Sequence, residues 1–156
     1  MKRLYFSDRH GPLVDVLFRG QVDGESVEGL SPLFKQLTDV VLFSAMIGKF
    51  HNRSGELVGQ SGGELQISAF RNNEDGIVFL LGLQEIGDPA AFKGEADECW
   101  DLLRRYSVGG MDTILEWVAG LTEDKFEGVL LEKLREVAIA SKKPTTIKIK
   151  KPKRII

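Results

Sequence analysis

The chain has 156 residues, 42% hydrophobic and 28% charged, with a formal net charge of −2, a profile typical of one soluble globular domain. A chain of this length buries roughly two thirds of its unfolded surface and needs neither a metal nor a disulfide to fold, and its single cysteine, Cys99, fits a reducing compartment. No apolar run approaches the roughly 20 residues that cross a bilayer, so we expect a cytoplasmic protein that is neither secreted nor inserted in a membrane.

The first part of the chain predicts a short helix, a loop and a long central helix. Residues 12–18 are mostly apolar and predict the short helix, and the turn-rich, acidic sequence at 20–29 predicts the loop. The Ser-Pro pair at 31–32 is typical of a helix start, because serine caps free backbone N–H groups and proline fits the first helical position. Apolar residues then recur at three- and four-residue steps, so we expect this helix to bury a broad face before it ends at Gly48.

The middle of the chain predicts a loop, an extended segment and a buried helix. Residues 49–63 are polar and rich in glycine, and residues 64–70 alternate with the period of a short strand. Residues 77–86 are hydrophobic on nearly every side, which favours a buried helix that stops before Pro89.

The last third predicts three helices. Residues 95–106 form an amphipathic helix, residues 107–110 interrupt it, and a short helix follows at 112–119. Thr122 is a candidate cap for the last helix. We therefore expect a mainly α protein, a single compact helical domain of about five helices with at most a short strand or hairpin. The expected buried stripe of the last helix is Phe126, Val129, Leu130, Leu134 and Val137.

Side chains that carry metal or nucleophile chemistry are few. His10 and His51 lack the co-ligands of a zinc site, so we expect both in surface loops. Cys99 lies beside Trp100 on the apolar face of its helix, and we expect both in the core, together with the other large aromatic residues Tyr106 and Trp117. The sequence thus predicts no catalytic residue, no metal site and no cofactor.

Two local patterns leave alternatives open. Asp39 followed by Glu64 parallels the D…E-x-K metal site of many nucleases, with Gln66 at the lysine position. The adjacent Arg104 and Arg105 form either a small anion site or ion pairs with nearby acids.

A helix-turn-helix is a further alternative, with residues 95–106 and 112–119 as its two helices around Gly109-Gly110. The second helix would then read DNA, yet it contains no basic residue. An ordinary packed helix pair is therefore favoured. The polar residues of that helix are Asp112, Thr113 and Glu116.

The strongest single feature is the charge of the C-terminal end. Residues 1–140 carry all 23 acidic residues and 14 basic ones, whereas residues 141–156 carry seven basic residues and no acid. This contrast predicts a folded helical domain at 1–140 and a basic flexible tail at 141–156, which either binds DNA phosphates without reading bases or serves as a solubilising or partner-docking extension. The alternating residues 146–150 also suit an edge strand added to a partner. The candidate nucleic-acid contacts are Lys142, Lys143, Lys148, Lys150, Lys151, Lys153 and Arg154.

Apolar runs and glycines recur in a fixed order within residues 31–118. The segments are Thr38–Gly48, His51–Arg53, Ile67–Phe70, Phe79–Pro89 and Tyr106–Met111. This order resembles the small accessory proteins of bacterial Dnd gene clusters, the DNA phosphorothioation-associated proteins. Such clusters exchange a backbone oxygen of DNA for sulfur or restrict DNA that lacks the mark.

The resemblance implies a role in defence against foreign DNA as an accessory or regulatory subunit. Our first hypothesis is a non-enzymatic adaptor whose acidic body contacts other proteins of the modification-restriction cluster and whose basic tail holds DNA. The alternatives are a small DNA-binding transcriptional regulator of the cluster, acting as a homodimer, and a metal-dependent nuclease.

Overall fold

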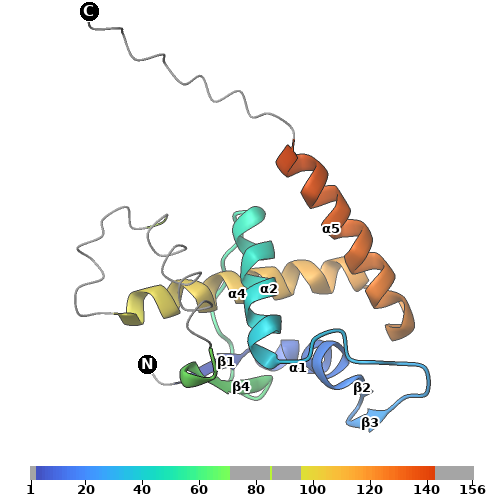
Figure 1. The fold of residues 1–156 in the computed structure, drawn as a ribbon. Coiled ribbons are helices and arrows are strands. Elements are labelled where there is room, and N and C mark those ends of the chain that lie inside the picture. Colours follow the sequence, from blue (N-terminus) through green and yellow to red (C-terminus); the bar gives the residue numbers. More distant parts are fainter. Residues whose placement is uncertain (1–2, 71–84, 86–95, 143–156) are drawn as a thin grey trace, which may run out of the picture.

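The computed structural model describes residues 3–70, Glu85 and residues 96–142, and these form a mainly helical fold, as predicted. Helices α2 (Leu37–Phe50) and α4 (Ala96–Val118) cross at the centre, and α5 (Phe126–Lys142) runs away from the end of α4 (Figure 1). None of the helices in the described part is long and apolar enough to cross a membrane.

The extended segment expected at 64–70 is confirmed in its first half. Strand β4 (Gly63–Gln66) pairs antiparallel with β1 (Arg3–Phe6), and Leu4 lies opposite Leu65. The second half is a 3-10 turn at Ile67–Ala69. Strand β1 was not predicted, because four residues give too short a pattern to separate a strand from the start of a helix.

The short helix predicted at 12–18 is confirmed, although it is built from three successive kinds of helical turn. The loop expected at 20–29 contains a small hairpin instead of irregular chain alone. The elements are a 3-10 turn (Asp8–His10), α1 (Gly11–Val14), a π-helical turn (Asp15–Arg19), β2 (Gln21–Val22) and β3 (Glu25–Ser26).

The central helix starts later than its sequence suggests. We predicted a start at the Ser-Pro pair at 31–32, whereas α2 begins at Leu37. The backbone N–H groups of Leu33 and Phe34 donate instead to the carbonyl oxygen of Leu17, at 2.9 and 3.0 Å. A tertiary contact with the first helical region therefore occupies the N–H groups that a serine cap at the predicted helix start would have bound.

Helix α4 is continuous, so the predicted interruption at 107–110 is wrong. Gly109 and Gly110 lie inside the helix because neighbouring backbone passes there: a Cβ atom at Gly110 would lie 1.6 Å from the carbonyl oxygen of Ser44, and one at Gly109 would lie 2.0 Å from that of Arg53. Gly48 lies at the same crossing on α2, where a Cβ atom would lie 2.1 Å from the carbonyl oxygen of Tyr106. The helix continues past this glycine to Phe50, so the predicted end at Gly48 is wrong.

Two buried serines join α2 to α4 at this crossing. The hydroxyl groups of Ser44 and Ser107 are 2.7 Å apart. Ser44 also donates to the carbonyl oxygen of Val41 at 3.0 Å, so Ser107 is the donor between the two hydroxyls. The hydrophobic core surrounds this contact. Its most deeply buried members are Leu17, Val14, Val40, Cys99, Leu103, Met111 and Ile114.

Helix α5 follows a 3-10 turn at Glu123–Lys125, and Thr122 makes no side-chain capping hydrogen bond. The buried stripe that we predicted for α5 is only partly correct. Phe126 and Leu130 are buried, whereas Leu134 is exposed. The reason is geometric: α5 contacts the body over its first turns and then diverges from it (Figure 1).

Candidate functional site

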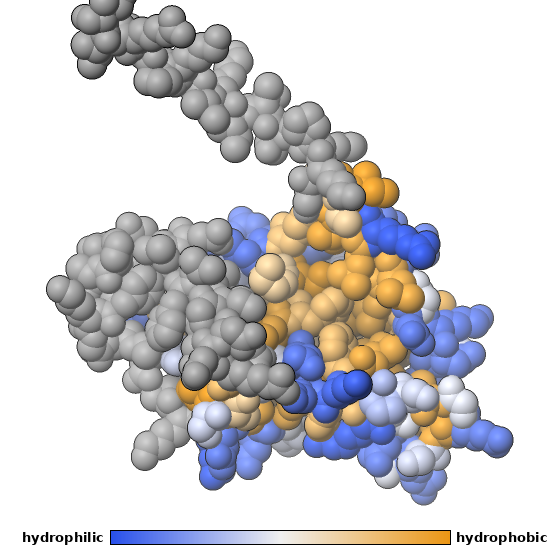
Figure 2. Space-filling model, viewed as in Figure 1, coloured by the Kyte–Doolittle hydropathy of each residue, from blue (hydrophilic) through white to orange (hydrophobic). Residues whose placement is uncertain are grey.

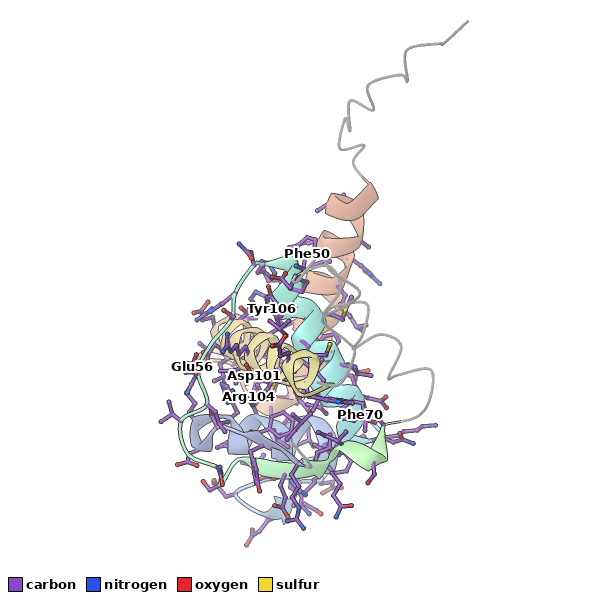
Figure 3. All side chains as sticks on the ribbon, turned by 90° about the vertical axis from the view of Figure 1, so that its left-hand side faces the viewer. Phe50, Glu56, Phe70, Asp101, Arg104 and Tyr106 are labelled. Atoms are coloured by element: carbon purple, nitrogen blue, oxygen red, sulfur yellow. The ribbon has the colours of Figure 1, made fainter. Side chains whose placement is uncertain are left out.

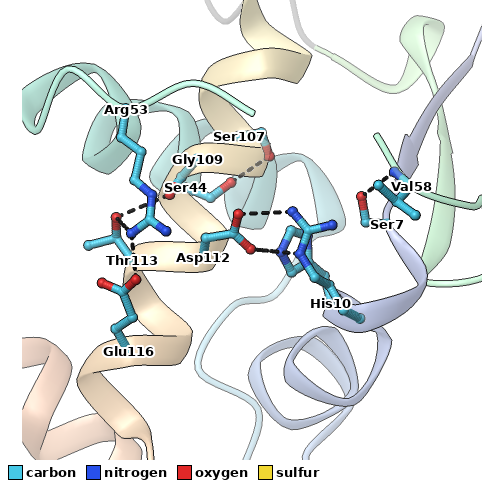
Figure 4. A network of polar contacts seen from close by, with 11 residues as sticks. Ser7, His10, Ser44, Arg53, Val58, Ser107, Gly109, Asp112, Thr113 and Glu116 are labelled. Atoms are coloured by element: carbon cyan, nitrogen blue, oxygen red, sulfur yellow. Dashed lines mark hydrogen bonds and ion pairs between the residues drawn. The ribbon is translucent and has the colours of Figure 1, made fainter. Parts of the chain in front are cut away.

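A partly buried polar junction fastens the N-terminal segment to α4 (Figure 4). The Asp112 carboxylate accepts hydrogen bonds from Arg9, Nε to Oδ1 at 2.8 Å and Nη2 to Oδ2 at 2.9 Å. The same Oδ1 accepts a hydrogen bond from His10 Nε2 at 2.7 Å. One carboxylate thus holds two neighbouring side chains of a segment that lies more than a hundred positions away in the sequence.

The prediction that His10 lies in a surface loop is wrong, because its side chain is fully buried. Burial lowers the pKa of His10 and outweighs the opposite effect of Asp112, so the ring is neutral at neutral pH. Nε2 then carries the proton that Asp112 accepts, and the buried Nδ1 has no hydrogen-bond partner. A ring with no access to solvent holds Asp112 in place and meets no substrate.

The electrostatics of Asp112 follow from the same contacts. Burial raises its pKa, but the hydrogen bonds from Arg9 and His10 outweigh that cost and bring the pKa down to about 2. Asp112 is therefore ionised at all physiological pH values, and it forms an ion pair with the guanidinium group of Arg9.

The polar residues of the helix at 112–119, the candidate DNA-reading helix, contact other parts of the same protein. Arg53 donates to the Glu116 carboxylate at 2.9 Å and to the Thr113 hydroxyl at 3.3 Å. The Thr113 hydroxyl donates in turn to the carbonyl oxygen of Gly109 at 3.1 Å. Together with Asp112, these contacts tie α4 to the segments that pack on it, and no separate recognition helix exists in the described part of the chain.

The candidate nuclease carboxylates lie on two different elements. Asp39 lies in the first turn of α2, whereas Glu64 lies on β4 and pairs with Arg3 at 3.3 Å. Within residues 3–70, Glu85 and 96–142, no group of three or more His, Cys, Asp or Glu side chains is arranged to hold a metal ion.

The adjacent Arg104 and Arg105 form ion pairs, which resolves one of the open alternatives. Both contact Asp101, one turn earlier on α4, and Figure 3 shows Asp101 beside Arg104. Cys99 on the same helix is buried, as predicted, and burial raises the pKa of its thiol. A buried thiol with a raised pKa is a poor nucleophile.

A second polar cluster lies at the end of α2. Lys49 pairs with Glu85 and lies 5.4 Å from the centre of the Tyr106 ring. The bond from Lys49 lowers the pKa of Glu85, and burial raises the pKa of Tyr106. Glu85 is the one described residue of the apolar stretch predicted as a helix at 77–86, and the rest of that prediction lies outside the described residues.

An apolar groove of about 240 Å³ separates the C-terminal half of α5 from the ends of α2 and α4. Figure 2 shows apolar side chains gathered over this region. His51 is exposed, as predicted, and its ring contacts Phe50 and Trp117 at centroid distances of 5.1 and 5.7 Å. Trp117, predicted in the core, is partly buried against it and also forms a wall of the groove. The groove is lined by Phe50, His51, Trp117, Lys133, Glu136, Val137 and Ala140.

The described surface outside the groove also has exposed apolar side chains. Met46 on α2 is 56% exposed, and Leu131 and Ile139 on α5 are 51% and 62% exposed. Contiguous apolar patches on a protein surface often mark interaction sites. This surface was not predicted, because the same residues at helical spacing also describe a buried face.

The structure describes one of the seven predicted nucleic-acid contacts. Lys142 is the last residue of α5. The other six, Lys143, Lys148, Lys150, Lys151, Lys153 and Arg154, lie outside the described residues.

The fold is thus a small helical domain in which the polar clusters hold its own segments together and the apolar groove beside α5 lies on the surface. A family model described as DNA sulphur modification system-associated protein 4 matches residues 24–149, and the chain belongs to this family. The suspected relation to the accessory proteins of Dnd systems is therefore confirmed. Neither a curated protein nor a solved structure shows a detectable match.

Proposed function

We propose that this protein is a non-enzymatic adaptor of a DNA sulphur modification and restriction system. Its folded body contacts other proteins of the system, and the basic residues from Lys142 onward hold DNA phosphates. The observation that carries the DNA part is the charge of residues 141–156, seven basic residues with no acid, on a member of this family.

The distribution of charge along the chain favours non-specific attachment to DNA over recognition of a DNA sequence. Residues 1–140 carry a net charge of −9 and repel the DNA backbone, whereas residues 141–156 attract it. Lysine-rich segments bind DNA mainly by releasing condensed counterions, which gives affinity without base recognition. An adaptor needs this kind of contact, because it has to stay on DNA of any sequence.

The described side chains of the body favour a role in binding other proteins over a role in catalysis. His10 is closed off from solvent, the Cys99 thiol is buried, and Glu64 is paired with Arg3. The alternative of a transcriptional regulator loses its main support, because the helix pair that would have read DNA is one continuous helix. Exposed apolar side chains such as Met46 instead give the body surface to share with a protein.

The experiment compares DNA binding by the full chain with a full-length variant in which all seven basic residues after Ala140 are replaced by glutamine. Fluorescence anisotropy of a labelled duplex reports the affinity. The matched control is a full-length chain whose residues 141–156 are scrambled, so that charge and composition stay the same. The proposal expects binding by the parent and the scrambled chain and loss of binding by the neutral chain.

Two results would contradict this proposal. Equal binding by the parent and the neutral chain would place the DNA contact in the body. Strong preference of the parent for one promoter sequence over random duplex would favour the regulator. A separate test of the non-enzymatic role incubates the purified chain with DNA and Mg²⁺ or Mn²⁺, and cutting that disappears in Glu64→Ala would establish the nuclease instead.

A further inference from the structure

We propose that α5 is a self-association helix, along which a second copy of this chain docks in antiparallel orientation. The contact is made by the outer stripe of α5, the side chains at four positions that lie on one face of the helix. These are Glu127, Leu131, Leu134 and Ala138.

The outer stripe is separate from the face of α5 that meets the body. Phe126 and Leu130 are buried against the core, whereas Leu131 is 51% and Leu134 36% exposed. Two leucines one turn apart leave apolar area in water, and a neighbouring helix would remove it at about 25 cal/mol per Å². Figure 1 shows α5 running away from the crossing of α2 and α4.

The spacing of the outer stripe suits pairing with a copy of itself. Its positions follow steps of four, three and four residues, the pattern by which two helices pack with interlocking side chains. This series reads the same in both directions. A two-fold axis between Leu131 and Leu134 therefore sets each Leu131 against Leu134 of the other copy, and each Glu127 against Ala138.

The charges along α5 select the antiparallel orientation. The helix starts at an acidic end, with Glu123 and Asp124 in the preceding turn and Glu127 in the first turn. The sequence from residue 141 onward is basic without any acid. An antiparallel pair sets the acidic start of one helix beside the basic end of the other, whereas a parallel pair would set acid against acid.

The first test measures the mass of the full-length chain in solution by sedimentation equilibrium. The proposal expects a dimer that the double substitution Leu131→Gln, Leu134→Gln weakens by about tenfold or more in Kd, since two buried side chains are worth more than the roughly 1.4 kcal/mol that a factor of ten requires. Circular dichroism confirms that the variant keeps its helices. The matched control is Val58→Gln, because Val58 is 62% exposed but lies on the segment before β4, away from α5.

The second test determines the orientation by disulfide trapping. Glu127→Cys and Ala138→Cys chains are oxidised singly and as a mixture, and native Cys99 stays buried. In an antiparallel pair the two copies of residue 127, like the two copies of residue 138, are about 16 Å apart along the helix axis, which is too far for a disulfide. Trapping in the mixture alone supports the proposal. A monomer at all concentrations, a dimer that the glutamine variant leaves unchanged, or trapping of each chain with itself overturns it.

Discussion

His10 and Asp112 form the contact that links the two ends of the folded body, with Nε2 of the buried imidazole 2.7 Å from the carboxylate Oδ1. Arg9 completes the junction from the exposed side. The neutral ring supplies a directed hydrogen bond, and the guanidinium supplies the charge that keeps Asp112 ionised. The junction therefore fixes the N-terminal segment on α4 without burying a charge that lacks a partner.

Substituting Asp112 tests how much this junction stabilises the fold. Asp112→Asn keeps the size of the side chain but removes the charge that two donors share, so we expect the free energy of unfolding to fall by about 2 kcal/mol. Urea denaturation measures the change. Glu116→Gln is the control, because Glu116 pairs with Arg53 in a more exposed place and its loss should cost less than about 1 kcal/mol. An equal loss in both variants would contradict the account.

The junction also predicts how stability depends on pH. His10 has a lowered pKa in the folded state, so the unfolded chain takes up a proton first as the pH falls below 6.5, and stability decreases from there. Asp112 adds a second decrease as the pH falls from 3.8 toward about 2. Free energies of unfolding measured between pH 8 and 2 should show both decreases.

Replacing the two histidines in turn isolates the first of these steps. His10→Gln should flatten the loss between pH 7 and 5, because the group that titrates is gone. His51→Gln should keep that loss, because this variant leaves the buried contact between His10 and Asp112 in place. A slope that follows His51 would be inconsistent with the buried neutral ring.

Two glycines in different helices predict opposite effects of the same substitution. Gly110→Ala places a Cβ atom against the backbone of Ser44 and should destabilise the protein by about 3 kcal/mol, because α2 and α4 have to separate. Gly128→Ala on α5 meets no atom within 4 Å and should stabilise it by about 0.5 kcal/mol. Thermal denaturation of both variants checks the sign, and a neutral Gly110→Ala would refute the close crossing.

The buried serine pair predicts an asymmetry between its members. Ser44→Ala leaves the Ser107 hydroxyl as a buried donor without its acceptor, which costs about 1–3 kcal/mol. Ser107→Ala should cost less, because Ser44 still donates to Val41. A double-mutant cycle by urea denaturation measures the coupling between the two hydroxyls. The reverse order of costs would mean that the donor has been assigned wrongly.

The sequence predicted those parts of the fold in which local pattern and tertiary packing agree. The amphipathic face around Cys99 and Leu103 is buried, and the alternation at 64–66 is strand β4. The start of α2 was misplaced because Leu17 accepts the backbone hydrogen bonds of Leu33 and Phe34. Local capping signals carry no information about such a distant acceptor.

The glycine pair at 109 and 110 misled the prediction for a related reason. Adjacent glycines usually end a helix, but here they let the backbone of α2 approach α4, and only the partner helix reveals that use. His10 was misplaced in the same way, because its partner Asp112 is distant in sequence. The groove beside α5 was missed since helical spacing identifies an apolar face but not what covers it.

The most direct test of the central claim is the salt dependence of DNA binding by the full-length chain. If the seven basic residues from Lys142 to Arg154 contact phosphates, the logarithm of the binding constant should fall with the logarithm of salt concentration with a slope of about −6. The chain with glutamine at those seven positions should bind too weakly to measure. A shallow slope, or equal affinity of the two chains, would contradict a tail that holds DNA.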